Sequence, residues 1–352
     1  MMVLMPNFQK VIEHAMRACI PLEVSIELTH QCNFRCKHCY IPDFQAPNLL
    51  TTERILGLLD ELAEMGTLFL SLTGGEVFLR KDWALIARRA RELNFHLTIL
   101  TNGALLDDAV ADTLAQLHAF VDISFHADDR EVFESITQRP GSFDATVAAI
   151  HRVHERGMYL KIKIPVMNLN QHTYPSAIEF AEKLGVEWSC SPKILTKTDG
   201  EFGPVLQRVS GRDLTKFMEA PTSGCHVVTE EDAHPAAGGG PLCAAGVRYA
   251  AISASGDVLA CNVMPGSAGN VLHSTFREIW EESPWLRQIR RVQRADLREC
   301  ATCSKFSYCN RCPAQALVED GDLLGLSRDA CKYAEAIEAA TDRKGRIDVA
   351  IP

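Results

Sequence analysis

Residues 22–40 read LEVSIELTHQCNFRCKHCY, a short β-like run followed at once by three cysteines. The run at 22–28 has the length and apolar content of a buried strand. Cys32, Cys36 and Cys39 then fall within eight residues, in the spacing Cys-x3-Cys-x2-Cys. Three thiols directly after a strand predict a metal site; three buried thiols or part of a zinc knuckle are the simpler alternatives.

The number of thiols in this loop is informative. A cubane iron-sulfur cluster takes one protein thiolate per iron, and a loop of about eight residues can wrap three of its corners. Three cysteines therefore leave one iron open, and an open iron can chelate a small molecule. A tetrahedral structural zinc site leaves no such position, because all four of its ligands come from the protein.

Five further β-like apolar runs follow the first, at residues 67–76, 95–103, 119–127, 158–166 and 186–192. Amphipathic segments separate them. After Thr52, apolar residues recur at i, i+3, i+4 and i+7, and Gly66 stands where a C-terminal cap belongs. The same pattern predicts helices after Asp82, Asp107 and Ser142, and a last helix that is closed by Gly185.

Repeated βα units imply parallel strands with right-handed crossovers, in an open sheet or in a full or partial barrel. Both arrangements bind ligands at the C-terminal ends of the strands. The informative motifs fall at those ends: the cysteine triplet follows the first strand, TGGE (73–76) the second, TNG (101–103) the third and SFHA (124–127) the fourth. We therefore expect one shared site.

Composition narrows the class of protein. The 352-residue chain is 47% hydrophobic and has a formal net charge of −9, without a long run of basic residues. This disfavours nucleic acid as the main partner. No window approaches the roughly 18 apolar residues of a membrane span, so we expect no membrane partner and a cytoplasmic location. The 13 cysteines, without a secretion signal, favour metal binding over a disulfide framework.

The triplet resembles the signature of the radical S-adenosylmethionine (SAM) enzymes, Cys-x3-Cys-x-aromatic-Cys, with His38 in the aromatic place. The resemblance implies that Cys32, Cys36 and Cys39 bind a 4Fe-4S cluster whose fourth iron chelates the amino and carboxylate groups of SAM. In that family, one-electron transfer cleaves SAM to a 5′-deoxyadenosyl radical, which abstracts hydrogen from the substrate.

The same resemblance implies the contacts to SAM. Gly74, Gly75 and Glu76 match the family's GGE motif, whose backbone and carboxylate receive the SAM ammonium and whose glycines let a carbonyl approach the ligand. His38 would lie beside adenine. Asn102, Ser124 and Arg139 stand where the family has third-strand, fourth-strand and carboxylate-pairing residues, although strand-end caps and a solvated arginine are equally open. His126, Asp128 and Asp129 are interpreted as loop residues.

A second set of cysteines lies beyond residue 241. It comprises Cys243, Gly256-x4-Cys261, Cys300-x2-Cys303-x5-Cys309-x2-Cys312 and Cys331. The set resembles the SPASM domain, an appended module with two auxiliary 4Fe-4S clusters, except that its last spacing is x2 where the family has x3. The resemblance implies Cys243, Cys261 and Cys312 as ligands of the first auxiliary cluster, and Cys300, Cys303, Cys309 and Cys331 as ligands of the second.

Alternatives remain open for several cysteines. Cys225 is either the fourth ligand of the first auxiliary cluster or a buried thiol, and in the second case an open iron there could bind substrate. Cys19 and Cys190 fit no ligand spacing, which favours core packing. The two close pairs within 300–312 could form one four-cysteine zinc knuckle, but that would leave the other cysteines of the set unexplained.

These observations define the expected architecture. We expect an α/β protein with a partial (β/α)6 TIM-like barrel, followed by a small cluster-binding SPASM domain with a β-hairpin and short helices. The hairpin is predicted within RYAAISASGDVLAC (248–261), turning at residues 255–256. The expected divisions are an N-terminal segment 1–21, the barrel 22–195, a bridging segment 196–241, the SPASM domain 242–340 and a C-terminal tail 341–352.

Enzymes that combine these modules commonly modify ribosomally made peptides. The expected function is therefore a peptide maturase that uses SAM and three 4Fe-4S clusters to cross-link, oxidise or epimerise its substrate. Relatives also process tetrapyrroles in haem pathways, mature sulfatases or act on small metabolites. A non-catalytic electron carrier is the alternative of another class, but it would not need a Gly-Gly-Glu motif beside a three-thiolate loop.

The expected partners are a peptide substrate and a flavodoxin- or ferredoxin-type electron donor. Peptide maturases often carry an N-terminal module that binds the leader peptide, whereas only about 21 residues precede the first strand here. Leader recognition is therefore expected from a separate protein or from the rim of the barrel.

Overall fold

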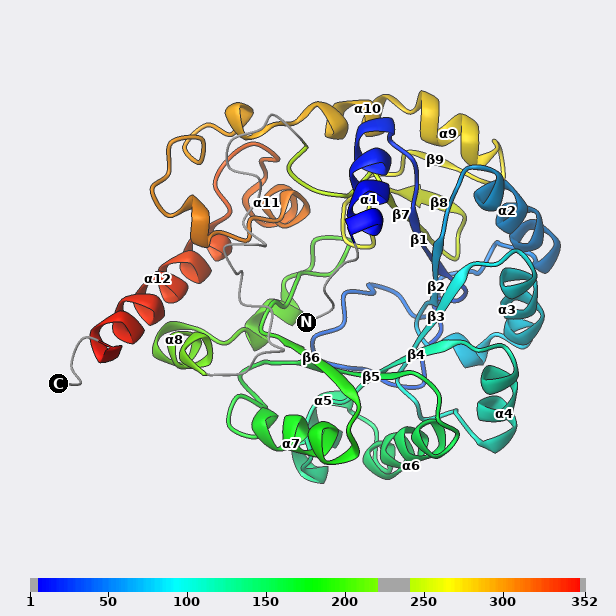
Figure 1. The fold of residues 1–352 in the computed structure, drawn as a ribbon, viewed down its shortest axis with the longest axis horizontal. Helices are drawn as coiled ribbons and strands as arrows, with labels where there is room; N and C mark the ends of the chain where they lie inside the picture. Colours follow the sequence, from blue (N-terminus) through cyan, green and yellow to red (C-terminus); the bar gives the residue numbers. More distant parts are fainter. Residues whose placement is uncertain (1–5, 221–240, 349–352) are drawn as a thin grey trace.

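The computed structural model describes residues 6–220 and 241–348, and Figure 1 shows their arrangement. Six parallel strands lie side by side in chain order, which confirms the expected partial barrel. They are β1 (Glu23–Glu27), β2 (Phe69–Thr73), β3 (His96–Thr101), β4 (Phe120–Ser124), β5 (Leu160–Pro165) and β6 (Glu187–Ser191).

Helices cover the outer face of this sheet (Figure 1). The five predicted from periodicity are α2 (Thr52–Glu64), α3 (Trp83–Glu92), α4 (Asp108–Gln116), α6 (Ser142–Glu155) and α7 (Tyr174–Leu184). In α2 the apolar stripe from Ile55 to Leu62 is fully buried, and Gly66 follows the helix with a φ of +86°. The hydrophobic periodicity thus identified the faces that pack on the sheet.

One barrel helix was not predicted. α5 (Arg130–Thr137) begins directly after Asp129, whose side chain accepts a hydrogen bond from Val132 N at 2.9 Å. Asp129 is therefore the N-cap of a helix and not a plain loop residue. Phe133 and Ile136 are buried, so this side of α5 packs against the rest of the barrel.

The cysteine-rich region adds strands to the same sheet. The predicted hairpin is confirmed as β7 (Tyr249–Ile252) and β8 (Asp257–Leu259), with Gly256 at a φ of +89° in the turn. β7 pairs in parallel with β1, and β9 (Gly269–Asn270) pairs with β8. The sheet therefore has nine strands, in the order β6-β5-β4-β3-β2-β1-β7-β8-β9.

Further helices, of which α12 is the longest, complete the described structure. They are α1 (Pro6–Ala18), α8 (Gly211–Glu219), α9 (Phe276–Glu282), α10 (Pro284–Arg291), α11 (Pro313–Asp320) and α12 (Arg328–Asp348), with 3-10 turns η1 (Val77–Leu79), η2 (Gly203–Gln207), η3 (Arg294–Asp296) and η4 (Phe306–Tyr308). α12 packs on α8 and runs through the expected boundary at 340/341. None of the helices in 6–220 and 241–348 has the length and apolar character of a membrane span.

Buried contacts join the cysteine-rich region to the barrel. One apolar core extends from the strands to Phe276, Trp280 and Ile337. The Trp280 indole donates to Cys19 O at 2.6 Å, and Phe276 N donates to the Glu61 carboxylate at 2.6 Å. The two regions are therefore fixed to each other by packing as well as by the shared sheet.

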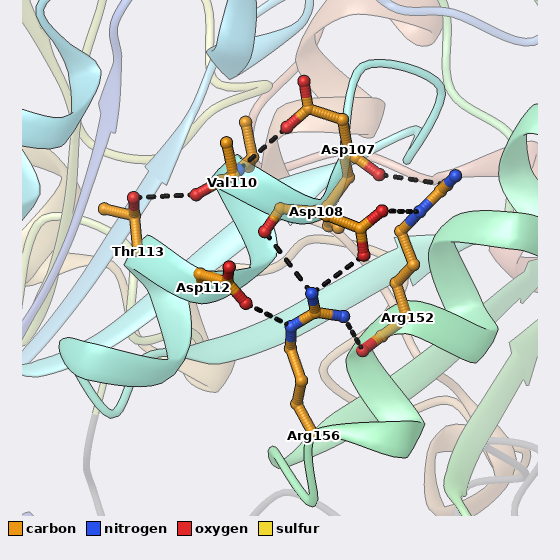
Figure 2. A network of polar contacts seen from close by, with 9 residues as sticks. Asp107, Asp108, Val110, Asp112, Thr113, Arg152 and Arg156 are labelled. Carbon is orange, nitrogen blue, oxygen red and sulfur yellow. Dashed lines mark hydrogen bonds and ion pairs between the residues drawn. The ribbon is translucent and has the colours of Figure 1, made fainter.

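On the far side of the barrel, α4 and α6 are linked at their surface (Figure 2). Arg156 Nε contacts Asp112 and its Nη2 contacts Asp108, both at 2.8 Å, while Arg152 Nε lies 3.5 Å from Asp108. These aspartates are exposed, so solvent and salt screen the attraction. The network marks a surface far in sequence from every cysteine motif.

Candidate functional site

The TGGE turn after β2 lies directly against the start of the cysteine loop. Gly75 N donates to Thr29 O at 2.7 Å, and Glu76 N donates to Gln31 O at 2.8 Å. A Cβ at Gly74 would come within 2.4 Å of Thr29 O, and a Cβ at Gly75 within 2.1 Å of Gln31 O. Gly74 and Gly75 are thus required because the neighbouring backbone approaches them closely. The sequence had suggested the approach of a ligand as the reason.

The other side of the cysteine loop rests on the end of α5. Arg35 N donates to Thr137 O at 2.9 Å, and Lys37 N donates to Ile136 O at 3.0 Å. Arg139 follows α5 with an exposed side chain, close in sequence to these contacts. Because α5 was not predicted, this support for the loop was not predicted either.

The three thiols of the loop lie near one another. Burial raises the pKa of Cys32 to about 11, and the charge of the Cys39 thiolate adds to that shift. Burial likewise raises the pKa values of Cys36 and Cys39, and the charges of Cys39 and Cys32 add to the shift at Cys36. Three partly buried thiols whose negative charges would repel one another suit iron, which binds the thiolates and neutralises their charge.

The arrangement does not suit a single ion. Among the described residues, no group of three or more His, Cys, Asp or Glu side chains converges to hold one metal ion. A cubane cluster is different, because each thiolate binds a separate iron and the sulfur atoms need not meet at one point. The three thiols of the loop fit the three protein ligands that such a cluster would take.

Glu76 is buried at the centre of the strand ends, with 1% of its surface exposed. Its carboxylate accepts from the Thr101 hydroxyl at 2.7 Å and from Asn102 N at 2.9 Å. Burial raises the pKa of Glu76 to about 7, against the opposing effect of these hydrogen bonds. The hydrogen bonds of the Glu76 carboxylate thus link the end of β2 to the end of β3 through protein contacts alone.

Asn102 connects the third strand to the cysteine loop. Its Nδ2 donates to Asn33 Oδ1 at 2.8 Å and lies 3.8 Å from Cys32 Sγ. Ser124 ends β4 and is half-buried at the same edge. The structure therefore brings Asn102 to the cysteine loop and places Ser124 on the fourth strand end, as the order of the motifs had suggested.

The rings of His38 and His126 pack against each other, a contact that the sequence did not predict. Their ring centroids are 4.9 Å apart in an edge-to-face arrangement, and neither Nδ1 atom has a hydrogen-bond partner among the described residues. Burial lowers the pKa of His38 to about 4 and that of His126 well below its ordinary value, so both rings are neutral. His126 lies in the loop between β4 and α5, as expected, but only 2% of it is exposed, which was not expected.

A cavity of about 280 Å³ opens beside this pair, at the ends of β5 and β6. His38 and Tyr40 line one part of it, and Lys193 and Ile194 line another. Tyr40 donates its hydroxyl to Glu27 Oε1 at 3.0 Å, and burial raises the pKa of Glu27. The cavity therefore lies next to the cysteine loop, with mostly apolar walls and a few polar groups.

The later cysteines fall into two groups of neighbours. Burial raises the pKa of Cys261 to about 12, and Cys312 and Cys243 add to the shift. Burial raises the pKa of Cys309 to about 11, and Cys331, Cys300 and Cys303 add to it. The seven thiols thus divide as 243, 261 and 312 on one side and 300, 303, 309 and 331 on the other.

This division bears on the alternatives. A four-cysteine zinc knuckle within 300–312 would need the Cys312 thiol beside the other three, whereas Cys312 is a neighbour of Cys243 and Cys261. Cys190 is buried in β6 and is disulfide-bonded, so it is not the plain core thiol that was expected. Cys225 lies outside the described residues, as do most residues of the AHPAAGGGP stretch (233–241).

Comparison with known families agrees with this geometry. Residues 26–181 match the model of the radical SAM superfamily, and residues 243–313 match the SPASM model, an iron-sulfur cluster-binding domain. The chain therefore belongs to the radical SAM superfamily and carries a C-terminal SPASM domain. A radical SAM domain implies SAM and a 4Fe-4S cluster as cofactors.

Individual relatives point to more than one substrate class. The AdoMet-dependent heme synthase of Methanosarcina barkeri is 26% identical over 86% of this chain and 94% of its own length. The PqqA peptide cyclase of Granulibacter bethesdensis is 26% identical over 93% of this chain and 92% of its own length. Among solved structures, Streptococcus suis SuiB bound to precursor peptide SuiA shares the fold, with a TM-score of 0.70 at 19% identity over 93% of this chain and 80% of that chain.

Proposed function

We propose that this radical SAM enzyme modifies a ribosomally synthesised peptide by cross-linking, oxidation or epimerisation. The observation that carries the proposal is the cavity beside His38, whose volume of about 280 Å³ suits one or two side chains. It is just below the roughly 300 Å³ at which pockets for drug-sized ligands begin. A peptide that lies across the mouth of the barrel would place a single side chain there.

The ligand assignments belong to this proposal. Cys32, Cys36 and Cys39 hold the cluster that chelates SAM, and the groups 243/261/312 and 300/303/309/331 hold two auxiliary clusters. The neighbouring thiols within each group support this division. The barrel (22–195), the bridging segment (196–241) and the SPASM domain (242–340) would be the corresponding functional units.

When bound, the first cluster and SAM supply the 5′-deoxyadenosyl radical. The residues of the chain hold the cysteine loop in place and contact SAM. Glu76 holds the strand ends together, and Asn102 fixes the start of the cysteine loop through Asn33. The buried neutral ring of His38 offers an apolar face for adenine, and Ser124 and Arg139 are proposed as further contacts to SAM. An electron donor of the flavodoxin or ferredoxin type and a separate leader-binding protein are the proposed partners.

A tetrapyrrole is the second candidate substrate. It is favoured by the similarity to the heme synthase of Methanosarcina barkeri along nearly the full length of that protein. Against it stands the cavity beside His38, whose volume of about 280 Å³ is small for a macrocycle with four pyrrole rings.

The test is anaerobic incubation of the reconstituted enzyme with SAM, dithionite and either short peptides encoded beside its gene or an iron-coproporphyrin. A SAM-dependent change in peptide mass, seen by mass spectrometry, supports the proposal. The variant with Cys32, Cys36 and Cys39 replaced by Ala is the control, and it should leave both substrates unchanged. Turnover of the porphyrin without turnover of any peptide would reverse the order of the two candidates.

A further inference from the structure

Arg311 stands between the two groups of SPASM cysteines. It lies two residues after Cys309 and directly before Cys312, which belong to different groups. Only 6% of its surface is exposed. The chain passes from one cysteine group to the other through Arg311. This buried side chain therefore places a positive charge between the two groups.

The guanidinium is held in place by backbone carbonyls. Its Nη2 donates to Leu323 O at 2.6 Å and to Gly325 O at 2.7 Å, and its Nε donates to Gly325 O at 3.2 Å. These carbonyls belong to the segment that leads into α12, which carries Cys331. Nη1 is buried and has no hydrogen-bond partner among the described residues.

No carboxylate balances this charge. Within 6–220 and 241–348, Arg311 forms no ion pair with Asp or Glu, and the ionised groups that stabilise its charge are the thiolates of Cys300, Cys309 and Cys312. Arg208 offers a comparison, because it is also largely buried. Its charge is balanced by two carboxylates: Glu319 lies 2.5 Å and Asp329 3.4 Å from its guanidinium. An unpaired buried charge is costly, so the partner of Arg311 must be anionic sulfur.

Clusters bound by thiolates are anionic, and their reduction potentials depend on net charge and on hydrogen bonds to sulfur. Reduction adds one negative charge to a cluster. A fixed positive charge nearby therefore stabilises the reduced form and raises the reduction potential.

We propose that Arg311 is a positioning residue that serves both auxiliary clusters at once, holding one positive charge between them and raising both reduction potentials. The inference rests on the ligand groups of the proposed function. It assigns Arg311 no contact with SAM or substrate. The auxiliary pair becomes a better electron acceptor than either group would be without the arginine.

Redox titration followed by electron paramagnetic resonance tests the proposal on the reconstituted full chain. Arg311→Gln should shift both auxiliary potentials to more negative values and leave the potential of the first cluster unchanged. Arg311→Lys keeps the charge and should restore both potentials toward those of the wild type. Arg298→Gln, which removes an exposed arginine of the same region, is the matched control and should shift none.

Two sets of results would overturn the proposal: unchanged potentials in Arg311→Gln, or a shift of one auxiliary cluster alone. If the Arg311→Gln protein fails to assemble the auxiliary clusters, the iron contents of the two variants are compared instead, and Arg311→Lys must retain the clusters. Equal loss of iron in both variants would assign Arg311 a purely structural role. A wild-type protein with iron for only one cluster would instead refute the ligand groups, and that outcome is visible before any variant is made.

Discussion

The two cysteine regions gather their thiols in opposite ways. The first region takes three thiols from one loop, which backbone hydrogen bonds fasten to the TGGE turn and to the end of α5. The second region takes seven thiols from segments between 243 and 331, where regular structure is short. Backbone contacts of the barrel therefore fix the first site, whereas we expect the order of the second region to depend more on bound metal.

The largest effect should follow from changing the first loop. Replacing Cys32, Cys36 and Cys39 by Ala should reduce SAM cleavage by at least about 1,000-fold, since the proposed SAM-binding cluster is assigned no other protein ligands. Iron analysis should show a loss of about four iron atoms per chain. Circular dichroism should show an unchanged fold, because backbone contacts and not thiols fasten this loop.

A matched change in the second region should behave differently. Cys309→Ala should lower the thermal stability more than Cys36→Ala does, because Leu297, Cys300 and Phe306 near Cys309 form a small apolar cluster separate from the main core. Removing iron with a chelator should have the same effect, and limited proteolysis should then cut first between 243 and 331. Equal stability of the two variants, with first cuts inside the barrel, would contradict the comparison.

The contact between the two loops of the first site can be tested through Gly75. Gly75→Ala should destabilise the protein by about 4 kcal/mol, because the new methyl group would meet the Gln31 carbonyl. Gly141→Ala is the control: Gly141 has a φ of +80° but open space around it, so about 1 kcal/mol is expected from backbone strain alone. Urea unfolding measures both. Equal losses of unfolding free energy would mean that the loop backbone moves to make room for the methyl group.

Glu76 should make the stability of the first site depend on pH. Its pKa is raised from 4.5 to about 7 on folding, so the stability it contributes is full below about pH 4.5 and is lost as the pH rises through about 7. From pH 5 to 8, the metal-free wild type should lose about 3 kcal/mol of unfolding free energy relative to Glu76→Gln. Parallel pH curves for the two proteins would show that the buried carboxyl is not perturbed.

The smallest effect is expected from the surface network of Figure 2. Arg156→Ala removes contacts to exposed Asp108 and Asp112, which lie far in sequence from both cysteine regions. Solvent already screens these pairs, so thermal unfolding should change little and SAM cleavage not at all. A loss of activity in this variant would show that the outer helices influence the strand ends.

The same contrast explains what could be predicted from the sequence. The first site was readable because its motifs are short and each follows a periodic strand, so the order of the strands brings Cys32, Glu76 and Asn102 together. α5 was missed although Asp129 is a plain N-cap signal, since the helix is a single short addition between β4 and α6. His126 was missed because contact with His38 depends on the path of the cysteine loop.

In the second region, the sequence predicted the hairpin but not its place. The alternation in β7 and β8 identifies two paired strands, and nothing in it indicates that β7 extends the barrel sheet beside β1. The grouping of the cysteines came from the resemblance to a family and not from spacing. Arg311 could not be singled out, since an arginine between two cysteines gains meaning only when burial and partners are known.

The central claim is that the loop of Cys32, Cys36 and Cys39 holds the cluster to which SAM binds. Electron paramagnetic resonance of the reduced, reconstituted protein tests it most directly, with SAM added to the wild type and to the Ala variant of all three cysteines. The account predicts that SAM changes the spectrum of the wild type only, while the auxiliary signals of the two proteins agree. The same SAM-induced change in both proteins would contradict it.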